Sequence, residues 1–129
     1  MEKINIKTDR RIELLDITDK VRSVVNKSGV KSGICFVFCP HTTAGLTINE
    51  NADPSVQKDI INTLNKIVPK DGGYAHSEGN ADSHVKSSLF GSSLSIFIED
   101  GRLSLGTWQG VYFCEGDGPR SREVWIKII

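Results

Sequence analysis

All three histidines of this 129-residue chain lie in two short polar segments. His41 directly follows an apolar run and a proline, while His76 and His84 are separated by eight positions across a glycine-containing turn. Neutral imidazoles on well-held backbone bind divalent cations, and this spacing allows two rings to reach one ion without enforcing it. We therefore predict a metal site with His41, His76 and His84 as ligands. The alternative is that each histidine only forms hydrogen bonds within its own loop.

Carboxylates accompany the histidines. Glu78 and Asp82 lie between His76 and His84, and Glu50 ends the polar segment that follows His41. A carboxylate can supply an oxygen ligand, orient a ligand histidine or act as a general base. If Asp82 caps a short helix, His84 lies in its first turn, where the helix dipole disfavours imidazolium and leaves the ring free to bind a cation. This donor set suits zinc or another first-row divalent metal better than calcium, and Glu78 and Asp82 are the candidates for general base.

The polar segments also carry side chains that bind phosphate. The neutral donors and cations suited to phosphate oxygens are Thr42, Thr43, Asn80, Lys86, Arg120 and Arg122. Arginine is favoured because its guanidinium can donate two parallel N–H bonds to phosphate oxygens. The stiff Gly118-Pro119 turn before Arg120 favours a positioned side chain, and Arg120 is the candidate cation for catalysis. Solvated charge flanking a strand is the alternative for Arg120 and Arg122.

Trp108 stands between Gly106-Thr107 and Gln109-Gly110. Two nearby glycines leave room for a ligand, so we predict that Trp108 forms the wall of a pocket for a flat ring. The alternative is that its indole packs in the core.

Hydrophobic periodicity predicts a scaffold rich in strands for these side chains. Residues 3–7 and 11–15 are expected to form a first antiparallel pair, and the apolar run 34–39 a central strand buried on both faces. Later strands are expected over 46–50, 93–100, 111–114 and 124–128, with Asp100-Gly101 as a two-residue hairpin turn.

Three helices are expected between the strands. One begins near Thr18 and ends at Gly29. The clearest follows Asp53 as N-cap and Pro54 as first helical residue, and its apolar stripe is interpreted as core. A short helix is expected from about 82 to 89. The predicted fold is α+β, with mostly antiparallel sheets packed face to face and two to three helices.

Composition narrows the function classes. The chain has 16 basic and 16 acidic residues and no net charge, which argues against binding nucleic acid through bulk charge. No apolar run is long enough to span a bilayer, and the start lacks a signal-peptide stretch, so no membrane partner is expected. The three cysteines lie in apolar segments and are interpreted as reduced, buried thiols of a cytoplasmic protein. The length fits a single domain over residues 1–129.

Four motifs, spread over nearly the whole chain, together resemble the YjbQ family, described as secondary thiamine-phosphate synthase. They are His41-Thr42-Thr43-Ala44-Gly45-Leu46-Thr47-Ile48-Asn49-Glu50, Glu78-Gly79-Asn80-Ala81-Asp82-Ser83-His84-Val85-Lys86, Leu105-Gly106-Thr107-Trp108-Gln109-Gly110 and Asp117-Gly118-Pro119-Arg120. The resemblance implies an α+β fold that partly resembles a double-stranded β-helix, assembled as a homotrimer. It also implies a histidine metal cluster, which maps onto His41, His76 and His84. The motifs Asn-Ala-Asp and Thr-Trp-Gln bring Asn80 and Gln109 into the expected substrate site.

Three functions remain open at this point. The first is a metal-dependent transferase that joins a pyrimidine-methyl pyrophosphate to a thiazole phosphate with loss of pyrophosphate. The second is metal-assisted hydrolysis of a phosphate ester, with Glu78 or Asp82 as proton acceptor. The third is a non-catalytic trimeric protein that binds a metal or a phosphorylated ligand. The expected cofactor is zinc, with magnesium as the alternative for pyrophosphate chemistry, and the expected partner is a small phosphorylated substrate.

Overall fold

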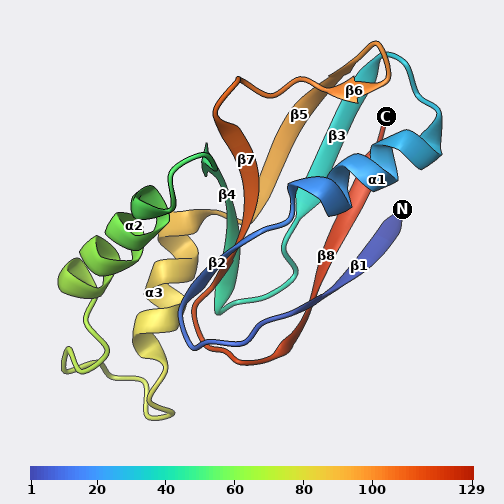
Figure 1. Cartoon of the computed structure of the whole chain (residues 1–129). Coiled ribbons are helices and arrows are strands. Elements are labelled where there is room, and N and C mark those ends of the chain that lie inside the picture. Colours follow the sequence, from blue (N-terminus) through green and yellow to red (C-terminus); the bar gives the residue numbers. More distant parts are fainter.

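Eight strands form two antiparallel sheets in the computed structural model, which describes all 129 residues (Figure 1). The larger sheet contains β1 (Glu2–Lys7), β8 (Ser121–Ile128), β3 (Gly33–Phe38), β5 (Ser93–Glu99) and β6 (Arg102–Leu103), in that spatial order. The smaller sheet contains β2 (Glu13–Asp16), β7 (Gln109–Glu115) and β4 (Ala44–Glu50), also in that order. Every strand pair is antiparallel, which confirms the predicted α+β class.

The inward-facing side chains of both sheets form one apolar core. Because successive side chains of a strand point to opposite faces, each strand contributes every second residue. Val37 of β3 and Ile126 of β8 represent the larger sheet in this core, and Phe113 of β7 and Leu46 of β4 represent the smaller. All three cysteines are free and buried, as predicted.

Three helices complete the fold. Helix α1 (Thr18–Ser28) buries Val21 and Val25 in the core. Helices α2 (Pro54–Ile67) and α3 (Ala81–Phe90) lie side by side on the outside of the smaller sheet (Figure 1). None of the helices is long and apolar enough to cross a membrane.

Two local predictions are confirmed. The Asp53 side chain accepts a hydrogen bond from the Ser55 N–H at 2.9 Å and caps α2, with Pro54 in the first turn. Asp100 and Gly101 join β5 to β6 with φ of 51° and 76°, the positive angles that a tight hairpin turn of this type requires.

Three predictions about pairing and burial are wrong. Strands β1 and β2 do not pair with each other, because β1 pairs with β8 and β2 with β7. Strand β3 is central but covered on one face only, since Phe36 and Phe38 remain 37% and 42% exposed on the other. The apolar stripe of α2 is not core: no α2 residue is fully buried, and Ile67 is 65% exposed, because the helix lies outside the sheets.

Candidate functional site

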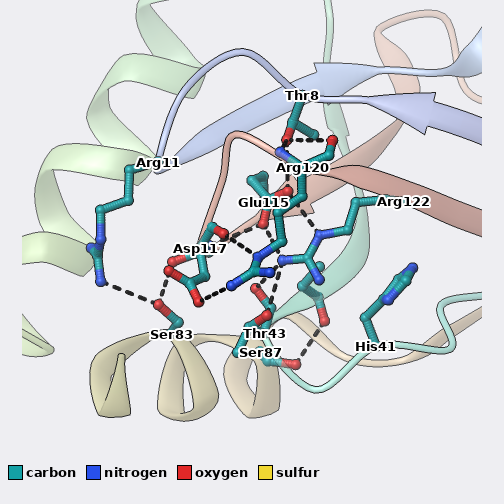
Figure 2. Close-up of polar contacts among 12 residues, drawn as sticks. Thr8, Arg11, His41, Thr43, Ser83, Ser87, Glu115, Asp117, Arg120 and Arg122 are labelled. Atoms are coloured by element: carbon teal, nitrogen blue, oxygen red, sulfur yellow. Dashed lines mark hydrogen bonds and ion pairs between the residues drawn. The ribbon is translucent and has the colours of Figure 1, made fainter. Parts of the chain in front are cut away.

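The apolar core ends in a polar layer at one end of the two sheets. Thr8 continues the inward row of β1, Arg122 begins that of β8, and Glu115 ends that of β7. His41 lies beyond the end of β3, in phase with the buried Cys39. Figure 2 shows these side chains together, with His41 on the Arg122 side of the cluster. The alternation that builds the core therefore also positions four polar groups.

Arg122 and Glu115 form a buried ion pair in this layer. Arg122 Nε donates to Glu115 Oε2 at 2.9 Å, Arg122 Nη2 donates to Oε1, and the two side chains are 6% and 0% exposed. Glu115 also accepts from the Thr8 hydroxyl at 2.8 Å and the Asp117 N–H at 2.9 Å. Burial opposes ionisation of Glu115, but these hydrogen bonds outweigh it and hold the pKa of the carboxyl below its usual value. Glu115 is therefore an ionised structural carboxylate whose two oxygens each accept two hydrogen bonds.

The predicted phosphate donors Thr42 and Thr43 are placed differently. Thr43 is buried, and its hydroxyl accepts from Arg122 Nη2 at 2.9 Å, so it supports the ion pair. Thr42 is exposed at the surface beside it. Of these two residues, only Thr42 is accessible to a ligand.

A second buried ionic cluster links α3 to α2. Lys86 Nζ donates to Asp82 Oδ2 at 2.9 Å and to Asn65 Oδ1 at 2.8 Å, and Arg11 Nη2 donates to Asp82 Oδ1 at 2.9 Å. Lys86 and Asp82 are both fully buried. Burial raises the pKa of Asp82, but the hydrogen bonds from Arg11 and Lys86 outweigh it and leave the pKa below its usual value.

The roles predicted for Lys86 and Asp82 do not fit this cluster. The two residues are spaced i, i+4 on α3, which places both side chains on the face turned toward α2. Lys86 is enclosed and cannot reach a substrate, and Asp82 is held as a carboxylate by two cations instead of standing free as a general base. The cluster fixes the start of α3, where His84 lies.

His41 is held by the backbone of β8. The Glu123 N–H donates to His41 Nε2 at 2.9 Å, and the ring packs edge-on against Phe113 with centroids 6.4 Å apart. Burial and the nearby Arg122 charge lower the pKa of His41, so the ring is neutral at pH 7.

His76 and His84 meet at the start of α3. Their ring centroids are 5.2 Å apart with the planes at 81°, and His76 Nε2 lies 3.7 Å from Glu78 Oε2. The Glu78 side chain is 72% exposed and the His76 side chain 41%. Within one chain, however, no group of three or more His, Cys, Asp and Glu side chains is arranged to hold a metal ion. The structure thus brings two of the three predicted ligands together, and His41 does not join them in the same chain.

Arg120 and Asn80 converge on Asp117. Arg120 Nη2 donates to Asp117 Oδ2 at 3.0 Å, and Asn80 Nδ2 donates to the same oxygen at 2.9 Å. The Arg120 side chain is 53% exposed, so it remains accessible to a ligand. Asn80 Oδ1 is buried without a partner, and Asn80 stands at the N-terminus of α3 without capping it through its side chain.

Trp108 lies in the turn before β7, and Gln109 is the first residue of that strand. The Gln109 side chain accepts from the Gly106 N–H at 2.7 Å, and the Trp108 carbonyl accepts from the Asn51 N–H at 2.9 Å. Both bonds hold the turn, while the Trp108 side chain is 62% exposed. Core packing is therefore excluded, and the indole is accessible to a ligand or to another subunit.

Sequence reasoning missed Arg11, Glu115 and Glu123. The available signal was the alternation of inward-facing and outward-facing residues along a strand, because Glu115 lies in phase with the inward-facing Val111 and Phe113 of β7. An acidic residue in a core row indicates a buried partner of opposite charge. Arg11 and the backbone of Glu123 act across the fold, and no local pattern indicates their partners.

The family comparison agrees with the four motifs. A family model described as UPF0047 protein YjbQ-like matches residues 2–129. The chain belongs to this family. It is 57% identical over 127 residues to UPF0047 protein MJ1081 of Methanocaldococcus jannaschii, covering 98% of this chain and 92% of that protein. It is 48% identical over 130 residues to UPF0047 protein YugU of Bacillus subtilis, covering 100% and 98%.

Solved structures of relatives have the same fold. A YjbQ/UPF0047 protein of Clostridium acetobutylicum superposes with a TM-score of 0.98 at 55% identity, covering 100% of both chains. A similar protein of Sulfolobus solfataricus superposes with a TM-score of 0.94 at 34% identity, covering 98% of this chain and 94% of that one. The first is described as uncharacterized and the second as of unknown function. The function must therefore be argued from the site.

Proposed function

We propose that the protein is a metal-dependent enzyme that acts on a phosphorylated small molecule. The observation that carries this proposal is the contact between His76 and His84, whose ring centroids are 5.2 Å apart at the start of α3. Two imidazoles beside an accessible carboxylate form a donor set suited to zinc, whereas magnesium prefers oxygen ligands. His76 and His84 would hold the cation, with Glu78 as the nearest oxygen donor.

An incomplete set of protein ligands favours catalysis over a structural role. Structural zinc sites are closed by four protein ligands, whereas catalytic sites keep a position open for water or substrate. When bound, the cation would polarise a phosphoryl oxygen and offset the charge of a departing phosphate. The buried pair of Asp82 and Lys86 stabilises the start of α3 and thereby fixes His84.

Two accessible side chains would hold the substrate. Arg120 is half-exposed and oriented by Asp117, so its free N–H groups can donate to phosphate oxygens. The exposed indole of Trp108 offers a flat apolar surface to a heterocycle. These groups suit the transfer suggested by the family resemblance, in which a thiazole phosphate joins a pyrimidine-methyl group and pyrophosphate leaves.

We also propose that the protein assembles as a homotrimer. The outer face of the larger sheet exposes Phe36, Phe38 and Phe97, the last by 67%. An aromatic surface on the central strand is costly in water and is covered when another subunit packs on it. Light scattering should then give three times the chain mass of 14.2 kDa, whereas a stable 14 kDa species would contradict the trimer.

The three free, buried thiols support a reducing compartment such as the cytoplasm.

The metal proposal is tested by metal content and turnover together. His76→Ala and His84→Ala should lose bound zinc, while Ser88→Ala, one turn further along α3 and exposed, should keep it. Formation of thiamine phosphate from the two precursors should require zinc and fall in Arg120→Ala. Full zinc content in both histidine variants would refute the ligand assignment. Zinc binding without turnover on any phosphorylated compound would indicate a binding protein in place of an enzyme.

A further inference from the structure

The hydrogen bond between Glu123 and His41 fixes the tautomer of the imidazole. A backbone N–H can only donate, so His41 Nε2 must accept with its lone pair and carries no proton. The proton of the neutral ring is then on Nδ1. A ring in this state has no free lone pair for a metal ion, because one nitrogen is engaged and the other is protonated. His41 therefore presents an N–H donor.

Arg122, which lies next to the His41 ring (Figure 2), offers a second donor. Its Nε and Nη2 bind Glu115 and Thr43, while Nη1 takes part in none of these bonds. His41 Nδ1 and Arg122 Nη1 have no partner within the chain, and Asn80 Oδ1 is the one fully buried side-chain N or O atom without a partner, so both nitrogens keep some contact with solvent. Figure 2 shows the His41 ring next to the Arg122 side chain.

We propose that His41 Nδ1 and Arg122 Nη1 form a binding site for a phosphate oxygen, and that His41 is a phosphate-binding residue and not a metal ligand. This inference rests on the proposed function only in assigning that phosphate to the substrate. The exposed Thr42, next to His41 in the sequence, offers a further hydroxyl.

The hydrogen-bonding groups left open at the site favour an anion over a cation. The groups that act on His41 are Arg122, Glu115 and Glu123. Glu115 already accepts four hydrogen bonds, and Glu123 Oε1 accepts one from Trp125 Nε1 at 2.9 Å. The groups left open are two N–H donors, one of them on a cation whose side chain is 94% buried. Burial strengthens a charge-assisted hydrogen bond from such a donor.

The lowered pKa of His41 agrees with this arrangement. Burial and the Arg122 charge both disfavour a second proton on the ring. The imidazole thus stays neutral at pH 7, with Nδ1 as its donor.

The test combines two replacements of His41 that each keep one side of the ring. His41→Asn retains a donor near the Nδ1 position, and His41→Gln retains an acceptor near the Nε2 position. Binding of inorganic phosphate to the zinc-free protein should weaken by less than about threefold in His41→Asn and by about tenfold or more in His41→Gln. Zinc content should be unchanged in both, and nitrogen NMR of the wild-type imidazole should show the proton on Nδ1.

Three results would overturn the inference. They are an Nε2-protonated ring, equal phosphate affinity in His41→Gln and wild type, or loss of zinc in either His41 variant. His76→Asn serves as the matched control, because it should lose zinc and leave the His41 tautomer and phosphate affinity unchanged. A wild-type protein that binds no zinc but shows the expected tautomer and phosphate affinity would refute the proposed metal-dependent function and leave this phosphate site standing.

Discussion

Replacing Lys86 by methionine should destabilise the protein strongly. Methionine keeps most of the volume but removes the ammonium that lies 2.9 Å from Asp82 Oδ2 and 2.8 Å from Asn65 Oδ1. Asp82 is fully buried, and removing one partner of a buried ion pair costs about 3–5 kcal/mol because the other charge stays behind. Arg11 still holds Asp82 Oδ1 at 2.9 Å, so we expect the lower end, about 3 kcal/mol.

Urea denaturation at pH 7 and fixed protein concentration measures this loss of unfolding free energy. The control is Lys66→Met, the same change at an exposed lysine, which should stay within about 0.5 kcal/mol of wild type. The double variant Lys86→Met with Asp82→Asn removes both charges and should recover at least about 1 kcal/mol relative to Lys86→Met alone. A Lys86→Met protein within about 1 kcal/mol of wild type would refute the assignment of a buried ionic cluster.

Three further perturbations have defined outcomes. Asp82, Glu115 and Asp117 have folded pKa values below their usual range. Their contribution to stability is therefore present above the unfolded carboxyl pKa of about 4 and is lost as pH falls through the folded values. The urea midpoint should drop between pH 5 and pH 2, and a constant midpoint would contradict this. Burial raises the pKa of the Cys35 thiol to about 11 and also raises the pKa values of Cys39 and Cys114. A thiol reagent at pH 7 should therefore label the protein only after denaturation, and labelling of the native protein would show that the thiols are accessible. Phe38→Glu places a charge on the outer face of β3 and should give a folded monomer by light scattering and circular dichroism, whereas an intact trimer would exclude this face as the subunit contact.

Local signals in the sequence predicted individual elements well. The Asp53-Pro54 start of α2 and the Asp100-Gly101 turn are correct because a side-chain cap and two positive φ angles are properties of a few consecutive residues. No local signal indicates the pairing of β1 with β8, since this pairing joins the two ends of the chain and is decided by how the core closes.

The structure brings some of the predicted site residues together, and it gives several of them structural partners that the sequence does not indicate. The meeting of His76 and His84 follows from a glycine-containing loop that leads into α3. An isolated lysine gives no sign of burial, so the sequence predicts Lys86 as a substrate cation, although its spacing from Asp82 allows an ion pair on one face of α3. The role of His41 depends on a backbone N–H from β8, which no local pattern could indicate.

The most direct test of a metal-dependent function is an anomalous difference map at the zinc edge from crystals grown with zinc. We expect one peak per chain at about 2.0–2.1 Å from a ring nitrogen of His76 and of His84. We also expect His41 of the same chain to lie outside the coordination shell, with its Nε2 still bound to the Glu123 N–H. The absence of a peak beside the histidine pair, or a peak coordinated by His41 in place of that pair, would contradict zinc binding by His76 and His84.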